Sequence, residues 1–292
     1  MNLSNYSESK VRGLLHLERK MQPDDQERFA DRIQFLETGT GSRSGCLGNL
    51  GASCQIRSML AYFQDGDIVA MKHWAYLSSK ARIMLAHMEV GNDYLTEDLL
   101  WPLLSDNEEV IDWYRQNQSM YHPEKPSIDG GDKDNPKSWM YYRYQSWLAL
   151  NKRWDELGDR CERILAMQDE IKKDRSYLID HRFYLALARG DVATMTNVLL
   201  EKVRPAERKR RYLQQSGLTW DLIDSYATVF AKLAWRCGYE LDLDTPWIPK
   251  EWLPVKPLGK YEDPWLFMQT FDIWQPFAEP YTKYSPHKQE RQ

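Results

Sequence analysis

The chain has 292 residues, of which 42% are hydrophobic and 28% are charged, and its formal net charge at pH 7 is −4. This composition is ordinary for a soluble globular protein, and the length is enough for one large or two ordinary domains with a substantial core. The net charge is too small to indicate a nucleic acid or a membrane surface as a partner.

Targeting signals are not expected. No apolar stretch approaches the roughly 18 residues that span a bilayer, and the first residues lack the basic and apolar regions of a secretory signal. The cysteines are scattered without C-x-x-C spacing, which is typical of reduced structural thiols: Cys46, Cys54, Cys161 and Cys237. We therefore expect a cytoplasmic protein.

Helical periodicity begins near Pro23, where apolar residues recur at i, i+4 and i+7: Phe29, Ile33 and Leu36. A glycine-rich break follows, and the next apolar stripe runs over 47–63 and stops at Gly66. A third amphipathic run starts at Ile68 and is expected to end near Gly91. The N-terminal part of the chain is therefore predicted to be helical.

A Gly-Asp pair separates two amphipathic runs at two places in the chain, at Gly66-Asp67 and at Gly190-Asp191. Glycine suits the left-handed position that ends a helix because it has no Cβ. Aspartate is a good N-cap because its carboxylate accepts hydrogen bonds from the first free amides of the next helix. Each pair therefore predicts the corner of a helical hairpin, and two such corners suggest stacked hairpins.

A short apolar stretch over 96–104 is followed by Ser105-Asp106-Asn107-Glu108, which has the S-x-x-E form of a capping box. This pattern predicts a helix that begins there and buries Val110, Ile111 and Tyr114.

Residues 121–138 contain several proline and glycine breakers and are expected to form the one long internal loop. The loop separates an N-terminal helical group, 1–120, from a C-terminal group, 139–237. Because the apolar stripes on both sides need partners, we predict a single α-helical domain over 1–292.

A repeat is visible beyond the loop. Trp147-Leu148-Ala149-Leu150 recurs 37 positions later as Tyr184-Leu185-Ala186-Leu187, and each copy precedes a turn and another amphipathic run. A helix-turn-helix period in the mid-thirties is that of tetratricopeptide-like stacking, although the consensus residues are absent. The predicted fold is all-α, with stacked antiparallel helical hairpins.

A last helix is predicted from about Thr219 to Cys237-Gly238, followed by a tail over 238–284 that is rich in Pro and Trp. Proline lacks an amide donor and restricts its predecessor, so the tail is expected to lie extended across helix faces and to cap the array. Asp263-Pro264 is interpreted as the N-cap and first residue of a short helix through Phe271.

No pattern of catalytic, cofactor-binding or metal-ligating residues is found, and none is assigned. The six histidines form no metal motif, and the Asp-rich segment 129–135 lacks the Glu that closes a calcium loop. His181, which follows Asp180 just before the helix that contains Tyr184, is expected to make a capping or packing hydrogen bond. These observations favour a protein that is not an enzyme and has no cofactor.

Charge is distributed unevenly. Between Ile83 and Tyr114 there is no Lys or Arg, whereas eight acidic residues lie there: Glu89, Asp93, Glu97, Asp98, Asp106, Glu108, Glu109 and Asp112. A basic cluster occurs over 202–211. Both can be solvated helix faces, and the acidic span can also steer a basic partner. The basic cluster lacks interleaved aromatic residues, so nucleic-acid binding is not expected.

With these elements in view, the chain resembles the immunity protein 49 family of bacterial polymorphic-toxin systems. The resemblance is carried by the segment from Asp180 to Leu187, the Gly190-Asp191 corner, the helix around Ala227–Ala234 and the closing Ile248-Pro249 and Tyr261-Glu262-Asp263-Pro264. It implies an all-α fold and a binding role in which a cognate toxin is held inactive. It supplies no catalytic residues.

The leading hypothesis is an immunity protein that neutralises, by stoichiometric occlusion, a toxin delivered by type VI or contact-dependent secretion. The proposed charge partners are Asp93, Glu97, Asp98, Glu108, Glu109 and Asp112, with Trp101 and Trp113 either as anchors or as core residues. The alternatives are a helical-repeat adaptor that binds another protein, an enzyme of unrecognised type, and a nucleic-acid binder through 202–211.

Overall fold

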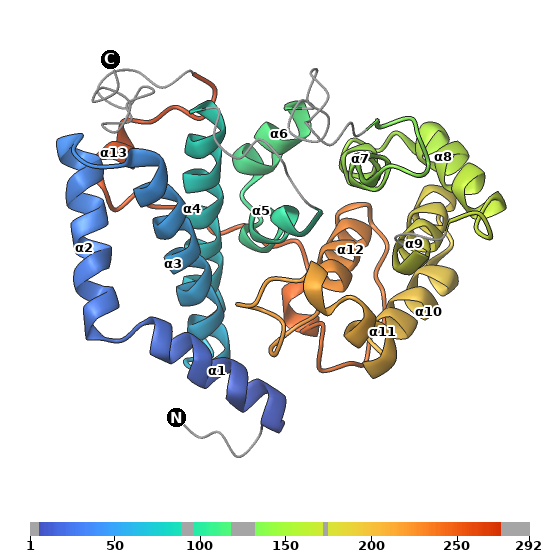
Figure 1. The fold of residues 1–292 in the computed structure, drawn as a ribbon, viewed down its shortest axis with the longest axis horizontal. Coiled ribbons are helices and arrows are strands. Elements are labelled where there is room, and N and C mark those ends of the chain that lie inside the picture. Colours follow the sequence, from blue (N-terminus) through green and yellow to red (C-terminus); the bar gives the residue numbers. More distant parts are fainter. Residues whose placement is uncertain (1–5, 89–95, 118–131, 172–174, 276–292) are drawn as a thin grey trace. The chain divides into compact units, whose positions relative to one another are not determined.

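Helices make up nearly all the regular structure of the protein. The structure is a computed structural model, and it describes residues 6–88, 96–117, 132–171 and 175–275 (Figure 1). This part of the chain forms thirteen α-helices with short 3-10 turns between them, and it contains no strand. The predicted all-α array of packed helical hairpins is therefore confirmed.

The chain divides into two compact units, and neither is continuous in sequence. Of the described residues, 6–88, 104–113 and 257–275 belong to unit 1, and the remainder belong to unit 2. The boundary passes within α5 (Leu100–Ser105) and α6 (Glu108–Gln116). Most of the predicted loop over 121–138 lies outside the described residues.

Unit 1 is built on a long antiparallel hairpin of α3 (Arg43–Phe63) and α4 (Ile68–His87), with α1 (Glu8–Lys20) and α2 (Pro23–Thr38) packed against α3. The corner between α3 and α4 is the predicted one. Gly66 has a φ of 69°, and the carboxylate of Asp67 accepts hydrogen bonds from the amides of Val69 and Ala70.

The C-terminal segment of unit 1 is attached to α4 through polar contacts. The carboxylate of Asp263 accepts hydrogen bonds from Lys80 Nζ at 2.6 Å and from Tyr76 Oη at 3.0 Å. Tyr261 Oη donates to the carbonyl of Ser105. The prediction that Asp263 caps a helix is wrong, because its carboxylate is bound by α4 and the helix, α13 (Leu266–Gln269), starts three residues later.

The predicted capping box at Ser105 is also wrong. Ser105 ends α5, and the side chain of Asn107 accepts the hydrogen bond from the amide of Val110 that caps α6. Asp106 adopts a left-handed φ of 56°, and its carboxylate lies 2.6 Å from Lys72 Nζ in a fully buried ion pair. Asp106, which the sequence pattern places inside the capping box, is therefore held by an ion pair with a residue distant in sequence.

Unit 2 contains consecutive hairpins of α7 (Trp139–Leu150), α8 (Trp154–Ala166), α9 (Leu178–Arg189) and α10 (Val192–Lys202), followed by α11 (Pro205–Arg210) and α12 (Ser225–Arg236). The Gly190 corner has the predicted geometry, with a φ of 68° and a cap from Asp191 to the amide of Thr194. The 37-residue echo corresponds to the C-terminal halves of α7 and α9.

Helix α12 starts at Ser225 and not near Thr219. Asp224 is its N-cap, accepting from the amide of Ala227, and the backbone amide of Asp224 donates to the carbonyl of Trp247. The extended segment after α12 buries its apolar side chains, as predicted for a capping tail: Leu243, Ile248, Trp252 and Leu253.

Candidate functional site

The residues predicted to bind a partner are divided between the two units. Glu97, Asp98 and Trp101 belong to unit 2, whereas Glu108, Glu109, Asp112 and Trp113 belong to unit 1, and Asp93 lies outside the described residues. Trp101 and Trp113 have exposed fractions of 6% and 3%. The alternative that both tryptophans are core residues is therefore confirmed.

The carboxylate of Glu97 is hydrogen-bonded within unit 2. Both of its carboxylate oxygens accept from the backbone amide of Ser216, at 2.9 and 3.1 Å, where the 3-10 turn Thr96–Leu99 packs against α12. Burial raises the pKa of Glu97 to about 7, although the Ser216 hydrogen bond acts in the opposite direction.

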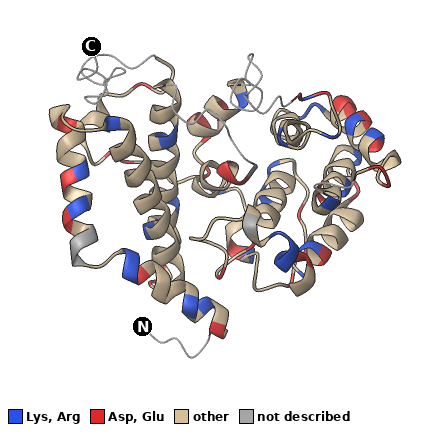
Figure 2. Ribbon diagram, viewed as in Figure 1, with Lys and Arg blue, Asp and Glu red and all other residues tan. Residues whose placement is uncertain are grey.

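Asp98 in unit 2 is half-buried, and the two exposed carboxylates of the predicted set lie at the start of α6. Glu108 and Glu109 occupy its first turn and are exposed, and Asp112 is half-buried one turn later (Figure 2). Carboxylates in the first turn of a helix are favoured by the helix dipole. These three residues are the part of the predicted acidic surface that unit 1 presents.

The basic cluster over 202–211 is only partly a surface feature. The blue band at α11 in Figure 2 marks all of its Lys and Arg residues. Of the cluster, Lys202, Arg208 and Arg211 are buried. The Arg208 guanidinium stacks on the ring of Trp247 and donates to the carbonyl of Trp220. These buried cations hold unit 2 together, and they leave a smaller basic surface than the sequence suggests.

Asp180 is the centre of a buried ionic cluster. Arg211 binds its carboxylate through two nitrogens at 2.5 and 2.8 Å, and Lys202 Nζ lies 2.6 Å from the same carboxylate. Burial alone would lower the pKa of Arg211, but Asp180 and other acidic neighbours outweigh it, so the pKa of Arg211 is raised. One carboxylate thus joins α9 to α10 and to the residue after α11.

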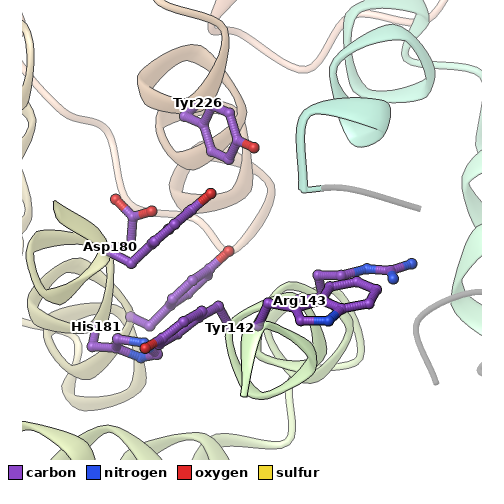
Figure 3. Close-up of a pocket in the computed structure, with 8 residues that line it drawn as sticks. Tyr142, Arg143, Asp180, His181 and Tyr226 are labelled. Carbon is purple, nitrogen blue, oxygen red and sulfur yellow. The ribbon is translucent and has the colours of Figure 1, made fainter. Parts of the chain in front are cut away.

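A cavity of about 110 Å³ lies next to this cluster, between α7, α9 and α12. Figure 3 shows Tyr142 and Arg143 reaching it from α7, Asp180 and His181 from α9, and Tyr226 from α12. The remaining lining residues are Trp139, Tyr177 and Tyr184, so five aromatic rings form most of the wall.

His181 contributes a buried polar atom to the lining of this cavity, as do Arg143 and Tyr184. It is 1% exposed, its Nδ1 lies 3.9 Å from the sulfur of Cys161, and its Nε2 has no hydrogen-bond partner. Burial lowers the pKa of His181 to about 3, and burial raises the pKa of the Cys161 thiol. Both groups are therefore neutral at pH 7.

The cavity is better suited to binding than to acid–base chemistry. A general base works best with a pKa near the operating pH, and burial moves the pKa of His181 far below it. The carboxylate of Asp180 is engaged by two cations and points away from the imidazole (Figure 3). The site offers aromatic surface together with polar atoms, among them Nε2 of His181.

One pattern in the sequence indicates this site. Tyr177, Asp180, His181 and Tyr184 are spaced i, i+3, i+4 and i+7, which puts them on one face of α9. An aromatic and ionisable stripe at the position of a core face indicates a polar cluster or a cavity. Of the capping or packing hydrogen bond predicted for His181, the structure shows a 3.9 Å contact between Nδ1 and the Cys161 sulfur, and Nε2 has no partner.

No known protein family, curated protein or solved structure matches the chain. Within the described residues, no group of three or more His, Cys, Asp or Glu side chains is placed to hold a metal ion. The same part of the chain contains no helix that is both long enough and apolar enough to cross a membrane.

Proposed function

We propose that this protein is an immunity protein that binds a cognate bacterial toxin and holds it inactive. The observation that carries the proposal is the distribution of charge on the helical scaffold. Asp180, Asp106 and Asp263 are buried or half-buried in ion pairs inside their own units, and the first turn of α6 carries two exposed carboxylates, Glu108 and Glu109. A basic surface on the toxin would find its complement there.

Binding would block the toxin stoichiometrically. A specific complex of this kind buries roughly 1,000 Å² or more of surface in total, and the acidic side chains of α6 would raise the rate of capture through electrostatic steering. This is the role that the resemblance noted in the sequence implies, although no family model matches the chain, and the chemistry of the cavity in unit 2 favours binding over catalysis.

The test is rescue from a toxin, and the first protein to try is any secreted toxin that is found encoded next to this gene. Cells that express the toxin together with the chain should survive, and the purified pair should form a one-to-one complex by calorimetry. Replacing both exposed glutamates (Glu108→Lys and Glu109→Lys) should slow association by about tenfold, because rim charges act mainly on the association rate.

The matched control is a double substitution of exposed carboxylates on α8 (Asp155→Lys and Asp159→Lys), which changes the net charge by the same amount. Association that is unchanged in the α6 variant, or slowed equally in the α8 variant, would show that the α6 surface is not the binding site. Absence of both rescue and a complex would exclude the immunity role.

A helical-repeat adaptor is the second candidate, and the aromatic cavity favours it. Trp139 and Tyr177 are half-buried lining residues, so an aromatic side chain of a peptide could approach them. An adaptor would give no rescue from a toxin and would bind its peptide equally well in the α6 charge-reversal variant.

A further inference from the structure

We propose that the cavity between α7, α9 and α12 is a binding site for a phenol ring. The site lies wholly within unit 2, and it does not depend on the proposed immunity role. Three features identify the ligand: the size and aromatic lining of the cavity, the unused nitrogen of His181, and the cations that already cover two of the lining rings.

The volume suits one six-membered ring. Apolar cavities of roughly 150 Å³ remain dry and bind benzene, and the volume here, about 110 Å³, is of the same order. Tyr142 and Tyr177 stack with ring centroids 5.1 Å apart, and the Tyr142 ring lies 5.2 Å from the imidazole of His181. A planar aromatic ligand would extend this series of contacts.

His181 offers the ligand a hydrogen-bonding atom, Nε2. The imidazole is neutral, and its Nδ1 faces the Cys161 sulfur, which can accept or donate. Nε2 is therefore a donor in one tautomer and an acceptor in the other. A hydroxyl group complements both, whereas a carbonyl or an ammonium complements only one. Satisfying a buried polar atom removes a penalty that an apolar ligand would leave in place.

An ammonium ligand is disfavoured even though aromatic cages often bind such ions. The Arg211 guanidinium lies 4.9 Å from the ring centre of Tyr177 and 4.7 Å from that of Tyr226, and Lys202 Nζ lies 5.4 Å from Tyr226. These rings already have cations of the protein against them. The Asp180 carboxylate is likewise shared by Lys202 and Arg211, so the cluster has no excess negative charge.

The test compares two probes on the full chain, 4-fluorophenol and fluorobenzene, followed by fluorine NMR titration. We expect saturable binding of both and an affinity about tenfold higher for 4-fluorophenol, because only the phenol can bond Nε2. The absence of saturable binding of 4-fluorophenol, as for a cavity that holds only water, would overturn the proposal. Equal affinities for the two probes would also overturn it.

The variant His181→Phe keeps a ring and removes the nitrogen. Its affinity for 4-fluorophenol should fall to that for fluorobenzene, while fluorobenzene binding is unchanged. His16→Phe, on α1 of unit 1, is the matched control and should bind both probes as the wild-type chain does. A His181→Phe variant that keeps the full preference for 4-fluorophenol would refute the role of His181. The comparison of probes on the wild-type chain needs no variant to fold.

A second arm separates the two sources of a phenol ring. N-acetyltyrosine amide presents the same ring on a peptide backbone. If it competes with 4-fluorophenol, the natural ligand is a tyrosine side chain of a partner. If only 4-fluorophenol binds, the natural ligand is a free phenolic compound. Both results support a phenol site.

Discussion

Asp180→Asn is the substitution that tests the packing of unit 2 most directly. Lys202 and Arg211 lie within 2.8 Å of the native carboxylate, and both side chains are at most 2% exposed. At an effective dielectric constant near 20, two unit charges separated by 2.6 Å attract each other by about 6 kcal/mol. The amide retains the shape and one acceptor oxygen but removes the charge.

The expected loss of unfolding free energy is about 3–5 kcal/mol, because removing one partner leaves buried cations without compensation. The matched control is Glu201→Gln, which also converts a carboxylate into an amide. Glu201 accepts from Arg182 at 3.0 Å and also joins α9 to α10, but both side chains are exposed by a third or more. An exposed pair of this kind contributes less than about 1 kcal/mol.

Urea unfolding followed by circular dichroism measures both free energies. A loss of less than about 1 kcal/mol in Asp180→Asn, or equal losses in the two variants, would refute the reasoning. Either result would mean that Lys202 and Arg211 find other partners or reach water when the charge of Asp180 is removed.

Three further predictions concern the rest of the fold. Gly190→Ala and Gly66→Ala both place an alanine at a left-handed φ, which costs roughly 1–2 kcal/mol of stability. The Gly190 variant should lose more stability, because its Cβ would lie 3.0 Å from the Tyr239 hydroxyl, whereas a Cβ at Gly66 would have no atom within 4 Å. Equal urea midpoints for the two variants would contradict this. The pKa of Glu97 is raised from 4.5 to about 7, so between these pH values the folded state retains a proton that the unfolded state releases, and stability should fall as pH rises. Glu97→Gln should abolish this pH dependence of the unfolding free energy, measured at pH 5 and pH 8. An unchanged pH dependence would assign it to another group. Asp106→Ala should destabilise unit 1 by about 3–5 kcal/mol because Lys72 stays buried, and adding Lys72→Met should recover much of the loss in thermal unfolding; no recovery would show that the cost lies in the backbone at position 106.

Local signals in the sequence predicted the hairpin corners well. The geometry at Gly66 and Gly190 depends on one backbone angle and one capping side chain, so neighbouring residues determine it. The same reasoning failed at Ser105 and Asp263. There the decisive contacts are ion pairs with Lys72 and Lys80, which lie 34 and 183 positions away in the chain.

The candidate site depends even more on contacts between residues that are distant in sequence, so it is harder to predict than the hairpin corners. The sequence predicts that Lys202 and Arg211 belong to a charged surface, because a basic residue gives no indication of burial when its partner is distant in sequence. Their partner Asp180 is 22 and 31 positions away, respectively. The cavity requires the packing of three helices, and only the aromatic and ionisable face of α9 indicated it in advance.

The return of residues 257–275 to unit 1 has a consequence for the order of folding during synthesis. Every described residue of unit 2 has been made once Lys256 is added, whereas unit 1 still lacks the segment that carries Tyr261 and Asp263. Because the ribosome makes the chain from its N-terminus, synthesis of unit 2 is complete before synthesis of unit 1. Until residues 257–275 emerge from the ribosome, Lys80 on α4 cannot form its ion pair with Asp263.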